Sequence, residues 1–321
     1  MTADLANGYI LVGVDGSQSA LRAVRWAAQE AHHRRARVLI AHVVTPRQID
    51  YESPLSVDDQ VEMHGHDIVA AAEYRIEKHF PSVRSSVTVV AGDPTRSLIE
   101  LSRGALLTAV GATGRGRVRA AVFGSVAMAM ISRGHSPVAV IRVPEYYGAV
   151  QTGPVVVGVG GDDDGESALA WAFDEASRRH TCLVSVHTWD TRSTPTSLLE
   201  SSMAEMQARN ARVTEERATL AERLAGWQEQ YPDVPVTRIV RQGRPVDELV
   251  DIAEHAQLIV VGSRGHGERS GALFDSVTRM LIRRAPCSVL VARPDSRLNA
   301  VDPARSTPAR STPARSTPAR R

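Results

Sequence analysis

Short, continuously apolar runs alternate along the chain with longer segments whose apolar residues recur every three or four positions. The run Tyr9–Val14 is apolar throughout, as a parallel strand covered on both faces should be. In the following segment, 19–34, Leu21, Val24 and Ala28 fall on one helical face. This alternation of strand and helix is typical of a parallel sheet with helices on both faces.

The same alternation continues along the whole chain. In the first half it predicts strands at 9–14, 38–44, 83–91, 106–111 and 138–143, with helices at 19–34, 58–79, 95–103 and 124–133. In the second half it predicts strands at 155–159, 183–187, 234–240, 258–262 and 288–292. A long helix is expected at 196–231, with a stripe that covers the sheet: Met203, Met206, Val213, Leu220, Leu224 and Trp227.

A second, much longer period is superimposed on this pattern. The stretch 13–16 returns as 158–161, and Trp26 returns as Trp171, both at an offset of 145 residues. Later glycines return at an offset of 151 residues, which fits a longer middle helix in the second half. We therefore predict a tandem duplication, with domain one at 1–145 (copy one), domain two at 154–294 (copy two) and a tail at 295–321.

Charge divides the chain differently from hydropathy. The formal net charge is +2, but residues 301–321 alone carry +4, so the rest of the chain carries −2. The tail repeats Ala-Arg-Ser-Thr-Pro, a composition that cannot build a core and predicts disorder. Its arginines suit contacts with nucleic acid or anionic lipid, although a solvated extension is the simpler interpretation. Nucleic-acid binding by the two domains is not indicated.

Residue usage excludes several kinds of chemistry and location. Lys78 is the only lysine, and its neighbours indicate a solvated helix face, which argues against a Walker A lysine or a Schiff base. The two cysteines, Cys182 and Cys287, suit a reducing compartment. No export signal or spanning apolar stretch is recognisable, so we expect a cytoplasmic protein without membrane contact.

Two glycine-rich loops follow the first and fourth predicted strands of copy one. The first contains Gly13 and Asp15; the second reads Gly111-x2-Gly114-x9-Gly124-Ser125. Glycines let backbone amides approach a ligand, and a helix that starts at this Gly-Ser step favours an anion. Arginines between these glycines suit phosphate charge, whereas Asp15 suits ribose hydroxyls or a phosphate-bound Mg²⁺.

This combination resembles the tandem universal stress proteins, in particular their ATP-binding subgroup. The resemblance implies an α/β fold of two Rossmann-like (adenine nucleotide alpha hydrolase-like) domains, each with a five-stranded parallel sheet. It also implies bound ATP, with or without Mg²⁺, and pairing of domains through the last strand, within the chain or in a homo-oligomer. The nucleotide-binding residues that it implies in copy one are Gly13, Asp15, Val43, Gly111, Thr113, Gly114, Arg115, Gly116, Arg117, Gly124, Ser125 and Val126.

Copy two departs from this pattern at two positions. Gly160 replaces the early Asp15, and Asp275 replaces Gly124, where a carboxylate would repel phosphate. We therefore expect copy two to bind ATP weakly or not at all. The matching positions that the resemblance implies there are Gly158, Gly262, Arg264, Gly265, His266, Gly267, Ser276 and Val277.

The functional class that the resemblance implies is an ATP-binding, nucleotide-dependent stress-response or regulatory module. No catalytic residue is evident beside the loop, so we expect at most slow ATP hydrolysis. The alternative is an ATP-hydrolysing or adenylyl-transferring enzyme of the related α/β ATP-pyrophosphatase class, which uses Ser-Gly-Gly-x-Asp-Ser; here residues 14–19 lack the double glycine. An electron-transfer flavoprotein and a nucleotide-free structural dimer are further alternatives. His64 and His66 do not face each other on a helix, so no metal site is expected. His42 suits a structural role or the adenine rim.

Overall fold

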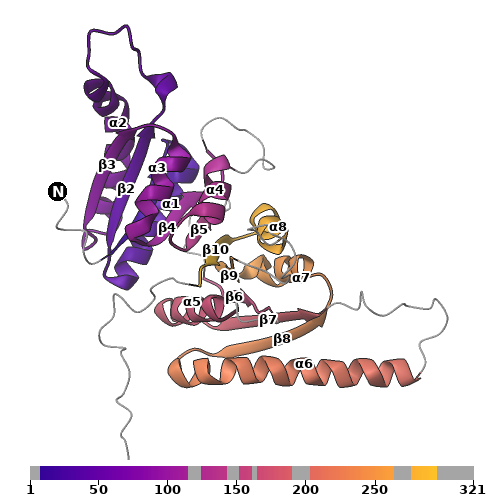
Figure 1. Cartoon of the computed structure of the whole chain (residues 1–321). Coiled ribbons are helices and arrows are strands. Elements are labelled where there is room, and N and C mark those ends of the chain that lie inside the picture. The colour runs from indigo at the N-terminus through magenta and orange to yellow at the C-terminus, as the bar shows by residue number, and fades with distance from the viewer. Residues whose placement is uncertain are drawn as a thin grey trace, which may run out of the picture.

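The computed structural model describes residues 8–114, 124–142, 152–160, 165–189, 203–263 and 276–294. Within them the two copies form two lobes that are joined through one sheet (Figure 1). Side chains of residues 203–205 and of Ser276 are outside the description.

Copy one alternates strands and helices from end to end. Its strands are β1 (Tyr9–Val14), β2 (Arg37–Val44), β3 (Ser85–Ala91), β4 (Ala105–Gly111) and β5 (Val138–Ile141). Its helices are α1 (Gln18–Arg34), α2 (Val57–His79), α3 (Pro94–Leu101) and α4 (Ser125–Arg133), with short 3₁₀ turns at Pro46–Gln48 and Ser102–Gly104.

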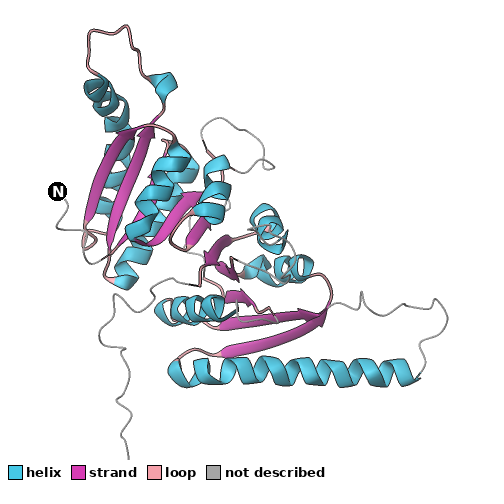
Figure 2. Cartoon of the chain, viewed as in Figure 1, coloured by secondary structure: helices cyan, strands magenta, loops and turns pink. Residues whose placement is uncertain are grey.

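Copy two repeats this order, as the secondary-structure colouring shows (Figure 2). Its strands are β6 (Val155–Gly158), β7 (Leu183–Trp189), β8 (Val236–Gln242), β9 (Leu258–Gly262) and β10 (Ser288–Ala292). Its helices are α5 (Gly165–Arg178), α6 (Met203–Gln230), α7 (Pro245–Ile252) and α8 (Ser276–Arg284), with a 3₁₀ turn at Ala253–His255.

The ten strands of the described residues form one sheet, in the order β3-β2-β1-β4-β5-β10-β9-β6-β7-β8. Among these strands pairing is parallel within each copy and antiparallel between β5 and β10, where Val140 lies opposite Val289. The expected α/β architecture with a mostly parallel sheet is confirmed. The last strands of the two copies pair within one chain.

Helices cover both faces of the sheet, and the strands alternate between two cores. In β1, Ile10 and Val12 join the core under α1 and α2, whereas Leu11 joins the core under α3 and α4. All three side chains are fully buried, which explains why this strand has a continuous apolar run rather than an alternating one.

The predicted start of the third strand was wrong in both copies, and one residue of the predicted α6 stripe does not cover the sheet. The third strand of each copy begins later than predicted, because Val83 N donates to Phe80 O (2.9 Å) and Val234 N donates to Tyr231 O (3.2 Å) in a turn that follows the helix. Met206, in the first turn of α6, is 54% exposed. Figure 1 shows that the start of α6 extends beyond the ends of β7 and β8. Residues 196–202 lie outside the described part.

A buried ring of charges joins the carboxyl-terminal parts of α1 and α5. Arg34 contacts Glu30 (2.5 Å) and Glu175 (2.6 Å), and Arg179 contacts the same two carboxylates at 2.9 and 2.8 Å. Glu30 matches Glu175 and Arg34 matches Arg179 at the 145-residue offset, so equivalent residues exchange partners. Asp174 adds a third carboxylate to Arg34, at 2.8 Å.

Aromatic rings flank this ring of charges on both sides. The Arg34 guanidinium lies 4.6 Å from the Trp171 ring centroid, and that of Arg179 lies 5.7 Å from the Trp26 ring. Cation–π attraction adds to the ion pairs where water is excluded. The repeated tryptophans of the sequence therefore mark the seam between the copies.

Removal of one ring member tests the contribution of this network. We expect Arg34→Met to reduce the free energy of unfolding by about 3–5 kcal/mol, because it leaves buried carboxylates without their cation. Urea denaturation followed by circular dichroism would measure the loss. Arg103→Met is the control, since Arg103 pairs with Glu100 in solvent. Equal midpoints for the two variants would contradict the assignment.

His33, beside the ring, should make stability depend on pH. Burial and the nearby Arg179 lower its pKa from 6.5 to about 4. Its Nδ1 has no hydrogen-bond partner among the described residues. As the pH falls below 6.5, His33 is protonated in the unfolded chain, whereas in the folded chain it stays neutral until about pH 4. The free energy of unfolding therefore decreases as the pH falls through this window. His33→Asn should reduce the loss of unfolding free energy between pH 6.5 and pH 4 by on the order of 1–2 kcal/mol. Identical pH slopes for wild type and variant would refute this prediction.

Candidate functional site

A cavity of about 250 Å³ opens at the carboxyl ends of β1, β2 and β4 in copy one. The sheet order places β2 and β4 on opposite sides of β1, so successive strands are added on one side of β1 and then on the other. Open α/β sheets bind ligands at such switch points. The cavity is lined by Gly13, Val14, Asp15, Ala20, Ala41, Val43, Pro94, Leu98, Val110, Gly111, Thr113, Gly114, Gly124, Ser125, Val126 and Ala127.

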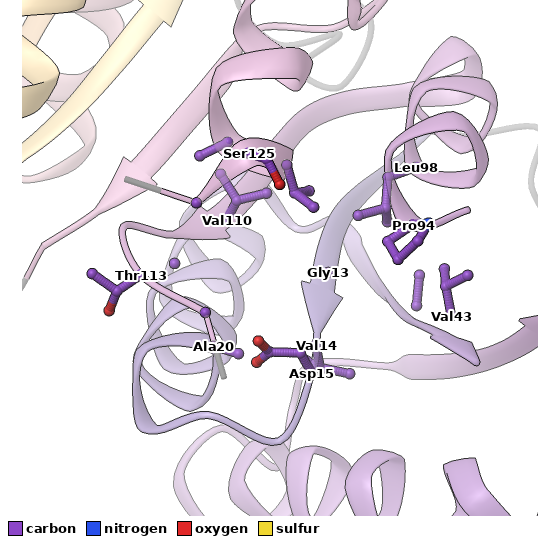
Figure 3. Close-up of a pocket in the computed structure, with 16 residues that line it drawn as sticks. Gly13, Val14, Asp15, Ala20, Val43, Pro94, Leu98, Val110, Thr113 and Ser125 are labelled. Atoms are coloured by element: carbon purple, nitrogen blue, oxygen red, sulfur yellow. The ribbon is translucent and has the colours of Figure 1, made fainter. Parts of the chain in front are cut away.

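One wall of the cavity is apolar. Val43 comes from the end of β2, and Pro94 and Leu98 come from one face of α3 (Figure 3). Asp93 caps α3 by accepting from Arg96 N (2.8 Å), which fixes where that helix starts. A flat apolar ring system suits this wall.

The opposite side of the cavity is polar. Asp15 Oδ1 accepts from Ser17 N at 2.9 Å, which orients the carboxylate directly after β1. Figure 3 shows this carboxylate pointing toward the loop that carries Thr113. A Cβ on Gly114 would lie 3.0 Å from Asp15 Oδ2. Glycine at this position therefore leaves room between the two loops.

Gly111 permits a still closer approach. A Cβ there would lie 2.6 Å from Ser19 Oγ, 2.8 Å from the backbone carbon of Ser19 and 3.0 Å from Ala20 N. Ser19 Oγ also accepts from Thr113 N at 3.3 Å. The end of β4 and the start of α1 thus pack backbone to backbone, which sets the floor of the cavity.

The amino end of α4 completes the cavity. Gly124 is its N-cap and supplies no side chain to cap the first-turn amides. The Ser125 hydroxyl points into the cavity (Figure 3). Uncapped amides and the positive end of the helix dipole favour an anion at this point.

Most of the copy-one residues expected from sequence meet at this cavity. These are Gly13, Asp15, Val43, Gly111, Thr113, Gly114, Gly124, Ser125 and Val126. Arg115, Gly116 and Arg117 lie outside the described residues. The lining residues that were not among the predicted site residues are Val14, Ala20, Ala41, Pro94, Leu98, Val110 and Ala127. The repeated Gly-x-Pro step at 92–94 was the available signal for Pro94, and Leu98 follows it by one helical turn.

His42 belongs to the opposite face of the sheet and does not line the cavity, so its expected place at the rim of a ligand site was wrong. It alternates along β2 with Ala41 and Val43, which line the cavity, and it is 3% exposed. Its Nδ1 contacts Val14 O at 2.8 Å. The equivalent His187 contacts Val159 O at 3.0 Å, so both histidines join the ends of neighbouring strands.

Copy two uses the same positions for internal contacts. Arg223 donates to the carbonyl of Gly160, which replaces Asp15, at 2.5 Å. Thr278, which replaces the cavity-lining Ala127, donates to Gly262 O at 3.2 Å. Gly158 packs against Leu249 as Gly13 packs against Leu98. Val277 lies in α8. The structure does not describe Arg264, Gly265, His266, Gly267 or the side chain of Ser276.

A second groove, of about 700 Å³, lies between the copies where α1 and α5 end. Its charged lining consists of Arg35, Arg84 and Arg178 with Asp233, and Arg178 is already paired with Asp174 at 2.9 Å. Helix carboxyl ends carry partial negative charge, which offsets the arginines. The charge of this groove therefore favours neither an anionic nor a cationic ligand. The copy-one cavity, in contrast, combines an apolar wall with an anion-binding helix end.

Two further kinds of site were sought within the described ranges. No group of three or more histidine, cysteine, aspartate or glutamate residues there has a metal-binding arrangement. No described helix combines the length and apolar character that crossing a membrane requires.

Comparison with known proteins gives a consistent picture. The model of the universal stress protein family matches residues 7–142 and again residues 152–293. A universal stress protein of Mycobacterium tuberculosis is 37% identical over 295 residues, which cover 88% of this chain and 96% of the relative. A solved universal stress protein from Archaeoglobus fulgidus aligns with a TM-score of 0.60 at 17% identity, over 90% of this chain and 97% of its own. A functionally unknown protein from Pseudomonas aeruginosa aligns with a TM-score of 0.61 at 16% identity, over 91% and 94%.

The close packing at Gly111 predicts a sharp difference between two glycines of the site. Gly111→Ala should cost about 1–3 kcal/mol of stability, because its Cβ overlaps the backbone of α1. Gly124→Ala should cost less, since nothing lies within 4 Å of its Cβ position. Thermal denaturation of both variants measures the difference. A larger loss for Gly124→Ala would show that the floor of the cavity is built differently.

Proposed function

The chain belongs to the universal stress protein family, with two domains of that family in tandem, and we propose that it binds ATP in the copy-one cavity and acts as a nucleotide-dependent stress-response module. The observation that carries this proposal is the union, in one cavity, of an apolar wall, an anchored carboxylate and an uncapped helix start.

The residues present fit an adenine nucleotide. Val43, Pro94 and Leu98 offer apolar surface to the base, and Asp15 offers an acceptor to ribose hydroxyls. Gly114 leaves the space between the loops that a side chain would fill. A cavity of about 250 Å³ is slightly smaller than the usual ligand pocket of about 300–1,000 Å³, and it suits the nucleoside part of the ligand.

The phosphates would extend to the start of α4. Backbone amides of its first turn and the Ser125 hydroxyl donate to phosphate oxygens, and the helix dipole favours their charge. Mg²⁺, if carried with the nucleotide, would neutralise phosphate charge. The Asp15 carboxylate suits contact with such a Mg²⁺ ion, and it also suits hydrogen bonds from the ribose hydroxyls.

Binding rather than catalysis is the proposed task. Among the described residues, the cavity lining contains one carboxylate, that of Asp15, and its Oδ1 already accepts a hydrogen bond from Ser17 N. The lining described for the cavity contains no histidine, lysine or cysteine to serve as base or nucleophile. Occupancy of the site would then act through the protein's conformation or its partners, in the cytoplasm where ATP is abundant.

Copy two is proposed to bind ATP weakly or not at all. Arg223 and Thr278 already engage the carbonyls of Gly160 and Gly262, which are the copy-two counterparts of Asp15 and Gly111. A ligand there would have to displace both contacts. A single dominant site per chain follows.

Calorimetric titration with Mg-ATP tests this proposal by counting sites. We expect about one site per chain. Ser125→Ala should weaken binding about ten-fold, because it removes a hydrogen bond to a charged group, and Gly111→Val should abolish it. The matched copy-two variants, Ser276→Ala and Gly262→Val, should retain wild-type affinity. Two equal sites would refute the asymmetry between copies, and no binding would refute the function. Phosphate release faster than a slow background would favour the ATP-pyrophosphatase-like alternative.

A further inference from the structure

The antiparallel pairing of β5 with β10 places the end of each strand beside the start of the other. Val140 lies opposite Val289, so Arg142, just after β5, adjoins the start of β10. Its backbone N–H donates to Ser288 Oγ at 3.2 Å. Each of these strands is preceded by a helix. A long side chain at one strand end therefore reaches the last turn of the other copy's helix.

Two arginines at equivalent positions reach the last helical turn of the other copy in this way. Arg293 of copy two donates to the carbonyls of Ile131 (2.5 Å), Met130 (3.3 Å) and Ser136 (3.1 Å) in copy one. These carbonyls belong to the last turn of α4 and to the segment that follows it.

Arg142 of copy one makes the reciprocal contacts. It donates to the carbonyls of Ala285 (2.9 Å), Ile282 (3.2 Å) and Arg283 (3.4 Å) in copy two. Arg142 and Arg293 are related by the 151-residue offset, and so are Ile131 and Ile282. The two arginines thus form matched clasps across the seam.

Only one of the two clasped helices leads to the copy-one cavity. Helix α4 runs from Ser125, which lines the cavity, to Arg133, two residues past Ile131. Nine residues are too few for an independently stable helix in water. The last-turn carbonyls also carry the negative end of the dipole, which a guanidinium stabilises. The order of the first turn of α4 thus depends on the core packing of Ala127, Met130 and Ile131 together with the contacts that hold its last turn.

We propose that Arg293 of copy two is a positioning residue for the nucleotide site of copy one, so that the affinity of this site depends on the seam between the copies. This inference rests on the proposed function. Arg293 acts through α4: it holds the last turn, and the first turn then presents its amides and Ser125 in the geometry that phosphate requires.

The coupling works in both directions by thermodynamic necessity. If the Arg293 clasp raises nucleotide affinity, a bound nucleotide strengthens the clasp by the same factor. Nucleotide occupancy would therefore tighten the α4 side of the seam and leave the α8 side, held by Arg142, unaffected. That difference gives the bound state a structural signature at the boundary of the two copies.

Matched substitutions separate this role from a merely structural one. Arg293→Ala and Arg142→Ala each remove a clasp from the same seam and should lower the thermal midpoint similarly. In calorimetric titration with Mg-ATP, Arg293→Ala should weaken binding roughly three- to ten-fold, a typical coupling through contiguous contacts. Arg142→Ala should leave it unchanged, and Arg293→Lys should recover part of the loss. Unchanged affinity in Arg293→Ala, or equal loss in both alanine variants, would overturn the proposal.

Hydrogen exchange of the nucleotide-free protein tests the clasp independently of ATP. Arg293→Ala should speed exchange of the α4 amides, and Arg142→Ala should speed exchange in α8 instead. This readout distinguishes two failures. If wild type binds no ATP but the exchange pattern holds, the proposed function is wrong and α4 positioning stands. If the α4 amides exchange at the wild-type rate in Arg293→Ala, the positioning role itself is wrong.

Discussion

The antiparallel pairing of β5 with β10 is the contact on which the rest of the tertiary organisation depends. It joins two parallel five-stranded sheets into one ten-stranded sheet. Because the pairing is antiparallel, equivalent positions of the two copies face each other with exchanged roles. This symmetry brings Arg34 and Arg179 to the same two carboxylates. It also sends Arg142 and Arg293 to each other's helices. The contacts between the copies are therefore polar on both faces of the sheet, in the ring of charges and in the arginine contacts, whereas the paired strands between these faces are apolar.

Duplication preserved the fold while the two sites diverged. The packing of Gly13 against Leu98 has its counterpart in Gly158 against Leu249, so the framework at the strand ends is retained. The polar contacts differ: in copy two, internal donors engage the carbonyls of Gly160 and Gly262. Under the function proposed above, copy two contributes Arg293 to the neighbouring site instead of a nucleotide site of its own.

The period of apolar residues predicted an element well where the whole element is buried. It failed where an element extends beyond the strands or helices on which it packs. The run at β1 is buried on both faces, so its bounds were evident. The apolar stripe of α6 continues past the sheet edge, where Met206 has nothing to cover. For the site, loop glycines and the helix start were recognisable because backbone conformation demands particular residue types. Leu98 was missed because an apolar helical residue has the same appearance whether it lines a core or a cavity.

The chain's duplication, its strand–helix alternation and the glycine loops at 13–16 and 111–125 were determined by sequence alone, because each is a local pattern with a local physical cause. Tertiary structure decided which copy's elements meet. Glu30, Arg34, Glu175 and Arg179 appear in the sequence as ordinary charges near helix ends, and only packing shows them as one buried ring. The reach of Arg293 to α4, 162 residues earlier in sequence at Ile131, follows from strand register. Register is set by how two sheets pair, which no local pattern encodes.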